Sequence, residues 1–273
     1  MTTHTVNPST AQAALNAANP GDTFLCVSGL YSAMEIRRSG GSGYPITIKP
    51  APNAKPLIRV GDNWSGVLIA ASYITLMGFD IIGRAMLLKY ADALAASKLP
   101  AGPRYSANGI SVMAWPDYPT LRNVIIKGNR VSFMPGGGIA TQCCDYLTIE
   151  DNTVHGCAWW SNYGQSGISV YASAHVDTRI TTPKTIVRRN TCTGNRNHIP
   201  FSLTGKIEDG HGIIIDDNLR THNPGKPAYV GKTLVQDNIC ASNHGMAICQ
   251  YKSANVELLD NKDIDNDLGA AGV

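Results

Sequence analysis

One phrase recurs along the chain and limits the folds open to it. Two apolar or small residues two positions apart are followed, three positions later, by Asn. The occurrences are Val124-Ile126-Asn129, Leu147-Ile149-Asn152, Thr185-Val187-Asn190, Thr233-Val235-Asn238 and Val256-Leu258-Asn261. The Asn residues are 23, 38, 48 and 23 positions apart, and Ile74, Leu76 and Phe79 repeat the form with Phe in the Asn position. A base unit with insertions predicts a solenoid of stacked coils.

A second phrase follows each Asn and begins with Gly. It is found at Gly66-Val67-Leu68-Ile69, Gly109-Ile110-Ser111-Val112, Gly138-Ile139-Ala140-Thr141, Gly167-Ile168-Ser169-Val170, Gly212-Ile213-Ile214-Ile215 and Gly245-Met246-Ala247-Ile248. Alternation with a period of two indicates β-strands. We expect the Asn side chains to stack at one corner of the coil, because Asn can donate and accept there and tolerates the left-handed conformation. Cys192 and Cys240 follow their Asn by two positions and should point inward.

The whole chain, 1–273, is therefore predicted to be a single all-β solenoid domain. A helix at 9–19, with apolar residues at helical spacing, would cap its N-terminal end. We expect insertions at 82–108, 153–166, 171–184, 191–211 and 216–232, the first containing a helix with Met86, Tyr90, Ala93 and Leu94 on one face. A row of Lys127, Glu150 and Arg188, each two positions before an Asn, predicts a ladder of ion pairs.

Composition excludes several classes of protein. Charged residues make up 16% of the chain and the net charge is +3, with Lys and Arg scattered, so nucleic acid is not an expected partner. No apolar stretch approaches the ~18 residues of a membrane span. The seven Cys form no Cys-x-x-Cys pair, which indicates buried thiols rather than a zinc site. The start, Met1-Thr2-Thr3-His4, has no signal-peptide pattern. The sequence leaves the oligomeric state open.

The strands at 167–170 and 212–215 have long insertions at both ends, which should form walls over the face between them. Alternation places Ser111, Ala140, Ser169, Ile214 and Ala247 in one outward row, and Met113, Gln142, Tyr171, Asp216 and Cys249 in the next. A walled face along stacked strands suits an extended polymer. Sugar rings stack on aromatic faces, so we predict that Trp159, Trp160 and Tyr163 bind substrate. Gln142 and Ser169 of the outward rows and Arg220 of a wall are the other predicted substrate-binding residues.

The densest group of ionisable residues lies around the strand at 212–215. Lys206, Asp209 and His211 precede it, and Asp216 and Asp217 follow it. We expect Asp209, His211, Asp216, Lys206 and Tyr171 to carry the chemistry, with His211 or Lys206 as a base and Tyr171 as an acid. Asp209, Asp216 and Asp217 could bind Ca²⁺, the one cofactor that the pattern suggests. The alternative is that these Asp and Gly residues only form turns.

The entry of the chain carries a family resemblance. The run from Ser9 to Tyr31, with Pro20-Gly21-Asp22-Thr23 and Gly29-Leu30-Tyr31, followed by Ser39-Gly40-Gly41 and by the Asn repeat, resembles right-handed parallel β-helix proteins of the pectate-lyase-like superfamily. The resemblance implies a β-helix, a polysaccharide substrate and a secreted or periplasmic location. That superfamily contains lyases, hydrolases, epimerases and non-catalytic adhesins.

The resemblance does not single out a reaction. Gly210-His211-Gly212 is similar to the Gly-His-Gly of polygalacturonase-type hydrolases, but their other motifs are missing, as are the Asp-Pro-His-Glu box of the uronan epimerases and the Arg-centred motif of pectate lyases. We predict a lyase that cleaves a uronic-acid polymer by β-elimination. The alternatives are a glycoside hydrolase using carboxylates such as Asp209 and Asp216, and a non-catalytic glycan-binding or structural β-helix.

Overall fold

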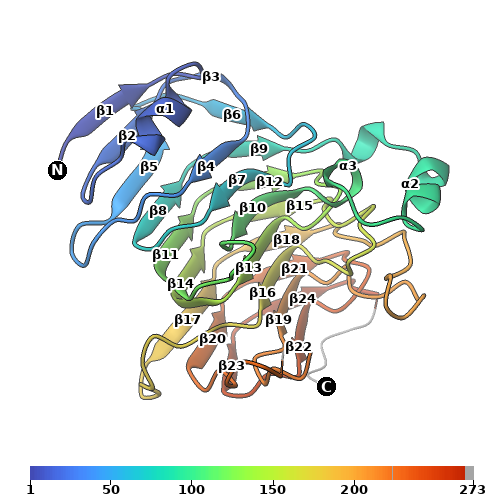
Figure 1. Cartoon of the computed structure of the whole chain (residues 1–273). Coiled ribbons are helices and arrows are strands. Elements are labelled where there is room, and N and C mark those ends of the chain that lie inside the picture. Colours follow the sequence, from blue (N-terminus) through green and yellow to red (C-terminus); the bar gives the residue numbers. More distant parts are fainter. Residues whose placement is uncertain (223, 268–273) are drawn as a thin grey trace.

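Three parallel sheets wind around one core in the computed structural model, which describes residues 1–222 and 224–267. The sheets contain nine, eight and seven strands, here named sheets A, B and C, and the chain visits A, B and C once per coil (Figure 1). Each strand pairs with its counterparts on the coils before and after it. The predicted all-β solenoid is confirmed.

Sheet A consists of β1 (Thr3–Val6), β2 (Thr23–Cys26), β5 (Ile46–Pro50), β8 (Ile74–Met77), β11 (Leu121–Lys127), β14 (Cys144–Glu150), β17 (Pro183–Arg188), β20 (Lys232–Gln236) and β23 (Val256–Leu259). Sheet B consists of β3 (Gly29–Tyr31), β6 (Pro56–Arg59), β9 (Asp80–Ile82), β12 (Arg130–Ser132), β15 (Thr153–His155), β18 (Thr191–Thr193), β21 (Ile239–Ala241) and β24 (Lys262–Ile264). Sheet C consists of β4 (Met34–Ile36), β7 (Ser65–Ile69), β10 (Asn108–Val112), β13 (Ile139–Gln142), β16 (Ile168–Tyr171), β19 (Ile213–Asp216) and β22 (Ile248–Tyr251).

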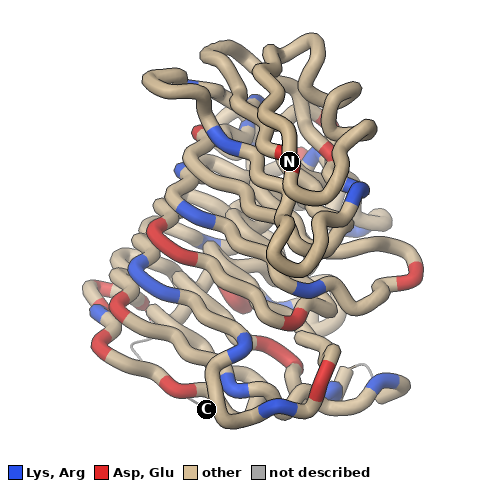
Figure 2. The backbone as a smooth tube through the Cα atoms, turned by 90° about the vertical axis from the view of Figure 1, so that its left-hand side faces the viewer, with Lys and Arg blue, Asp and Glu red and all other residues tan. Residues whose placement is uncertain are grey.

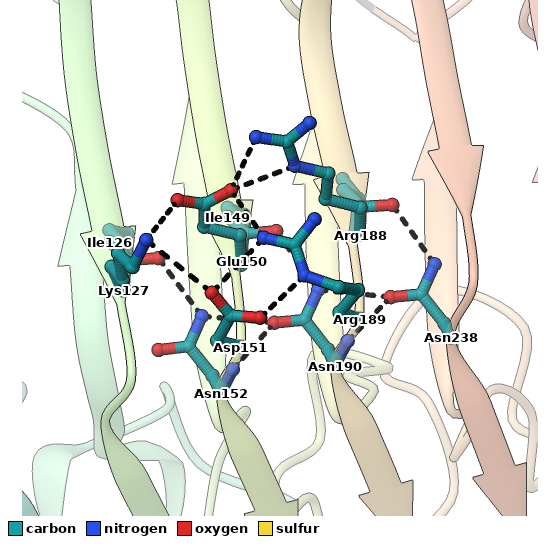
Figure 3. Close-up of polar contacts among 11 residues, drawn as sticks. Ile126, Lys127, Ile149, Glu150, Asp151, Asn152, Arg188, Arg189, Asn190 and Asn238 are labelled. Atoms are coloured by element: carbon teal, nitrogen blue, oxygen red, sulfur yellow. Dashed lines mark hydrogen bonds and ion pairs between the residues drawn. The ribbon is translucent and has the colours of Figure 1, made fainter.

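The Asn of the first phrase form a continuous ladder at the corner between sheets A and B. The backbone N–H and Nδ2 of Asn152 both donate to Oδ1 of Asn190, and Asn190 donates in the same way to Asn238. Nδ2 of Asn190 also donates to the carbonyl oxygen of Ile149. Figure 3 shows this ladder beneath the charged side chains of sheet A. The buried corner amides are thereby satisfied, as the sequence predicted.

The left-handed residue of each corner is the one before the Asn, which corrects the expectation that Asn itself adopts this conformation. Gly128, Asp151, Arg189 and Asp237 have φ values of 62°, 58°, 52° and 54°. Asn is therefore selected by its hydrogen bonds alone. A second ladder, Asn195–Asn243–Asn266, runs along the corner between sheets B and C and was not predicted.

The glycines that open the sheet C strands are explained by close stacking. A Cβ on Gly138 would lie 2.6 Å from the carbonyl oxygen of Gly167, and a Cβ on Gly212 would lie 2.6 Å from that of Ala247. Ala247, rather than Gly245, occupies this position on the last coil, because Ile213 is in register with Ile248. The predicted register of the last coil was therefore wrong by two residues.

The helices are shorter than the sequence suggested. The N-terminal helix α1 spans Ala11–Asn16, not 9–19, and buries Ala11 and Leu15 against the first coil. The insertion at 82–108 contains η1 (Ala85–Leu87), α2 (Tyr90–Ala96) and α3 (Pro103–Ser106), which project from the side of the stack (Figure 1). Ala93 is buried there, but Met86 and Tyr90 are 63% and 50% exposed, so the predicted common face does not form.

The charged row on sheet A is confirmed as a ladder of ion pairs (Figure 3). Lys127 and Arg188 flank Glu150, with nitrogen–oxygen distances of 2.9 and 2.8 Å. Arg189 extends the ladder by bridging Glu150 and Asp151. Figure 2 shows residues of both signs interspersed along the coils. The Glu150 side chain that three of these pairs share is 8% exposed, whereas Lys127, Arg188 and Arg189 are 38–42% exposed, so the ladder has a buried acidic centre and a solvated basic rim.

The thiols agree with the sequence expectation. All seven Cys are free and buried, and Cys192 stacks on Cys240 in the core. Among the described residues, no helix has the length and apolar character needed to cross a membrane.

Candidate functional site

Four side chains form an outward row on consecutive strands of sheet C. Gln142 is in register with Tyr171, Tyr171 with Asp216, and Asp216 with Tyr251. Adjacent strands lie roughly 4.8 Å apart, so neighbours in this row, hereafter the polar row, are within reach of one extended ligand. The sequence placed the first three correctly. Tyr251 takes the position expected for Cys249, because of the shifted register of the last coil.

The neighbouring outward row is mostly covered rather than open. Cys249, in register with Ile214, takes the position expected for Ala247 in this row. Ser111, Ala140, Ile214 and Cys249 are 1%, 9%, 6% and 8% exposed, whereas Ser169 remains partly exposed. The hydroxyl groups of Ser65 and Ser111 are hydrogen-bonded to each other at 2.6 Å. The expectation of free space above this row is therefore wrong at most of its positions, and the polar row is the accessible part of the face.

Asp216 is the titratable group of the polar row with the most perturbed environment. Burial, followed by the negative charges of Asp209 and Asp217, raises the pKa of its carboxyl to about 7, against the opposing effect of Lys252. Its Oδ1 atom is buried and has no hydrogen-bond partner among the described residues. A carboxyl group with one unpaired oxygen and a pKa near neutral can take up or release a proton during a reaction.

His211 and Asp209 are brought together at the end of the insertion before β19. Nδ1 of His211 accepts a hydrogen bond of 2.8 Å from the backbone N–H of Met246, so the neutral ring carries its proton on Nε2. That nitrogen lies 3.4 Å from Oδ1 of Asp209. His211 is buried and both of its ring nitrogens are engaged. The ring therefore orients Asp209 and is poorly placed to act as the base that the sequence suggested.

Lys206 and Asp217, two other predicted site residues, are placed differently. Lys206 lies in an exposed loop, where its described contacts are backbone hydrogen bonds to Phe201 and Thr204. Oδ1 of Asp217 accepts hydrogen bonds from the backbone N–H and hydroxyl of Thr221 at 2.6 and 2.8 Å. Asp217 is thus a turn-forming residue, as the alternative interpretation held.

The proposed Ca²⁺ ligands do not fit a metal site. The carboxylate of Asp217 is already occupied by the turn, and Asp209 is engaged with His211. Within residues 1–222 and 224–267, no three His, Cys, Asp or Glu side chains are placed to hold a metal ion. The donor set of this surface therefore gives no support to Ca²⁺ binding.

The wall formed by the insertions between sheets B and C contains the predicted aromatic residues in three environments. Trp160 is 8% exposed and donates from Nε1 to the carbonyl oxygen of Ala85, so it anchors the helical insertion. Trp159 is half-buried and packs edge-on against Trp160, with 6.0 Å between ring centroids. Tyr163 is 49% exposed. Only Trp159 and Tyr163 can offer surface to a sugar.

The opposite wall depends on a buried ion pair that the sequence did not reveal. Nζ of Lys184 lies 2.6 Å from Oδ2 of Asp145, and both side chains are 0% exposed. Tyr229 donates to the other oxygen of Asp145 at 3.0 Å, and Asp177 accepts from both Lys184 and Tyr146. The Tyr146 hydroxyl and then the backbone N–H of Arg179 hold the pKa of Asp177 well below its usual range. These contacts join the insertions at 171–184 and 216–232 to sheet A.

Arg220, predicted to bind substrate, lies inside this second wall. It is 4% exposed and donates from Nη2 to the carbonyl oxygen of Ser173 at 2.6 Å. Both terminal nitrogens lie 4.0 Å from the sulfur of Cys143, the residue that follows Gln142. Arg220 is therefore next to the C-terminal ends of β13 and β16.

A right-handed β-helix is the class of protein that this fold defines. Residues 120–273 match the family model described as right-handed β-helix region, and since this is more than half of the chain, the chain belongs to that family. No curated protein matches it by sequence.

Similar solved structures agree on the fold. One is the pectate lyase Pel9A, with a TM-score of 0.54, 13% identity and coverage of 99% of this chain and 78% of that one. Another is the GH136 lacto-N-biosidase from Eubacterium ramulus, with a TM-score of 0.55, 13% identity and coverage of 95% and 55%. A third is a mannuronic acid specific family 6 polysaccharide lyase from human gut microbiota, with a TM-score of 0.52, 14% identity and coverage of 96% and 53%. The chain spans about half the length of the last two.

Proposed function

We propose that this protein is a polysaccharide lyase that binds an extended uronic-acid polymer across sheet C and cleaves it by β-elimination. The observation that carries the proposal is the state of Asp216, whose carboxyl has a pKa of about 7 and a buried oxygen without a partner among the described residues. The kinds of glycan named for the similar β-helix structures support a polymer of this class.

The proposed reaction needs a base and an acid on the polar row. The Asp216 carboxylate removes the proton from C5 of a uronate residue. The electron pair of that bond forms the C4–C5 double bond, and the C4–O bond breaks. Tyr171, in register with Asp216, delivers a proton to the leaving oxygen. His211 and Asp209 set the charge beside Asp216, while Trp159 and Tyr163 offer surfaces on which sugar rings stack.

The test is to incubate the protein with a panel of uronic-acid polymers, with Ca²⁺ and with a chelator, and to follow the ultraviolet absorbance of the unsaturated product. We expect turnover with at least one polymer, independent of Ca²⁺, and its loss in Asp216→Asn. The control Asp237→Asn, an exposed carboxylate at a corner of sheet A, should retain full activity. If no polymer gives unsaturated product, the lyase proposal is wrong.

A glycoside hydrolase is the second candidate, favoured by one specific observation. The charge of Asp209 is a cause of the raised pKa of Asp216, so a carboxyl group with a raised pKa lies within electrostatic reach of a second carboxyl group. A protonated acid beside an ionised carboxylate is the arrangement that glycosidases use. New reducing ends without unsaturated product would identify this activity. A protein that gives neither product but binds glycan would be a non-catalytic module.

A further inference from the structure

Two cations meet at one sulfur atom beside the polar row. The Nη1 and Nη2 atoms of Arg220 each lie 4.0 Å from Sγ of Cys143, and Nζ of Lys226 lies 3.7 Å from the same atom. Lys226 also donates to the carbonyl oxygen of Tyr118 at 3.0 Å, and Arg220 to that of Ser173 at 2.6 Å. Residues from three separate turns thus enclose this position.

No acidic side chain in the described part of the chain balances this pair. Among the described residues, no carboxylate oxygen lies within 4 Å of Arg220 or Lys226, whereas Arg188, Arg189, Arg196 and Lys232 each have such a partner. The Nε atom of Arg220 is buried and has no hydrogen-bond partner in the same set. Two nearby positive charges repel each other, and a buried charge without a counter-charge is costly. An anion placed against these two cations would offset this cost.

The position of the pair tells which anion could reach it. Cys143 directly follows Gln142, and Arg220 lies one turn beyond Asp216, with its backbone N–H bonded to Asp217. Arg220 is buried, whereas Lys226 is exposed, so an anion from solvent would meet Lys226 first. The source that the position suggests is an acidic group of a glycan lying along the polar row, which begins at Gln142.

We propose that Arg220 and Lys226 form an anion subsite that takes an acidic substituent of the bound glycan, either a uronate carboxylate or a sulfate ester. Both substituents present oxygens to which a planar guanidinium can donate in pairs, with the ammonium of Lys226 as a second charge. The subsite deepens the proposed function, on which it rests for the glycan, because it selects acidic over neutral polymers without a metal ion.

Calorimetric binding can test the subsite without turnover, using Asp216→Asn as the background. Three probes of equal length are compared, an oligogalacturonide, a sulfated galactan oligosaccharide and a neutral galactan oligosaccharide, each with a chelator present. We expect at least one acidic probe to bind at least tenfold more tightly than the neutral one, and its affinity to fall with added salt. The preferred acidic probe identifies the source of the anion.

The variants separate this subsite from general charge effects. Lys226→Gln should weaken the acidic probe about tenfold and leave the neutral probe unchanged, and Lys226→Arg should restore binding. Lys98→Gln, which removes an exposed cation from the insertion at 82–108, is the matched control and should change nothing. Arg220→Gln should have a larger effect than Lys226→Gln, but because Arg220 is buried its folding must be checked first.

Three results would overturn the proposal. The first is that Lys226→Gln binds all probes as well as the Asp216→Asn background does. The second is that binding of the acidic probes requires Ca²⁺. The third is that Cys143→Ser abolishes binding of the acidic probes, which would make the sulfur rather than the cations the recognition group. Failure of the proposed function looks different: the acidic probes would still bind through Lys226, but the protein with Asp216 intact would release no product. Turnover of a polymer whose binding does not depend on Lys226 would refute the subsite alone.

Discussion

Nε2 of His211 lies 3.4 Å from Oδ1 of Asp209, while the other nitrogen of the same ring is held by a backbone N–H of the next coil. This relationship fixes the tautomer of the ring, and thereby a hydrogen-bond donor directed at a carboxylate whose charge influences Asp216. His211 is in this view a positioning residue for the proposed reaction rather than its base.

Two isosteric substitutions test that role. In His211→Asn the side-chain oxygen can still accept from Met246 but cannot reach Asp209, whereas His211→Gln can reach Asp209 and leaves Met246 N–H without its acceptor. We expect kcat to fall roughly 10- to 100-fold in His211→Asn with little change in KM, and to fall less in His211→Gln. Equal and unchanged kcat values in both variants would rule out the positioning role.

The raised pKa of Asp216 predicts how stability depends on pH. The folded protein holds a proton on this carboxyl up to pH about 7, whereas the unfolded chain releases it near 3.8. The stabilising contribution is therefore present below pH 3.8 and is lost as the pH rises to about 7. Asp216→Asn should accordingly be more stable than the parent at pH 8, by a few kcal/mol at most, and similar to it at pH 4. Urea unfolding at the two pH values measures the difference, and an equal difference at both would contradict the assignment.

The Asn ladder predicts a gradient of stability along the stack. Asn190→Ala removes the acceptor of two groups on Asn152 and the donor to Ile149, all buried, and should cost about 2–4 kcal/mol. Asn261→Ala acts at the last described rung, which is only partly buried, and should cost about 1 kcal/mol. Thermal or urea unfolding of the two variants measures the two losses of stability. Equal losses would contradict the gradient, and no loss in either variant would mean that the ladder is not a source of stability.

Breaking the buried ion pair between Lys184 and Asp145 should lower the free energy of unfolding by more than the loss of one ladder Asn. Lys184→Met leaves Asp145 without its cation in a fully buried place and should destabilise the protein by about 3–5 kcal/mol. Adding Asp145→Asn to the same chain should restore part of the loss. The control Lys232→Met breaks a half-exposed pair with Glu257 and should cost less than about 1 kcal/mol. If Lys184→Met behaved like this control, the wall would not depend on the ion pair.

The sequence predicts the repeating part of the molecule well, because each coil meets the same neighbours. The Asn ladder, the inward Cys192 and Cys240, and the row Gln142–Tyr171–Asp216 all follow from periodicity. The register error on the last coil has the same origin. A Gly is required where the carbonyl of a following coil approaches, and the last coil has no such neighbour among the described residues, so Ala247 is tolerated and Gly245 was misleading.

The walls could not be predicted in the same way. Lys184, Asp145 and Tyr229 are far apart in sequence and meet only through the conformations of two insertions, which no period describes. The buried place of Trp160 depends on a hydrogen bond to Ala85 in a third insertion. The sequence pattern pointed to the acidic residues around 212–215 and missed Lys226. Its proposed role depends on its contact with Cys143 and its closeness to Arg220, which only the fold brings about.

The spacing of the ladder Asn, between 23 and 48 residues, has an evolutionary consequence. The corner keeps the same hydrogen bonds whether a coil carries a long insertion or none, so the scaffold is insulated from the loops. New specificities can therefore arise by lengthening or exchanging one insertion at a time, while the hydrogen bonds of the ladder stay the same. For the same reason, a loop from another β-helix could be grafted between two rungs.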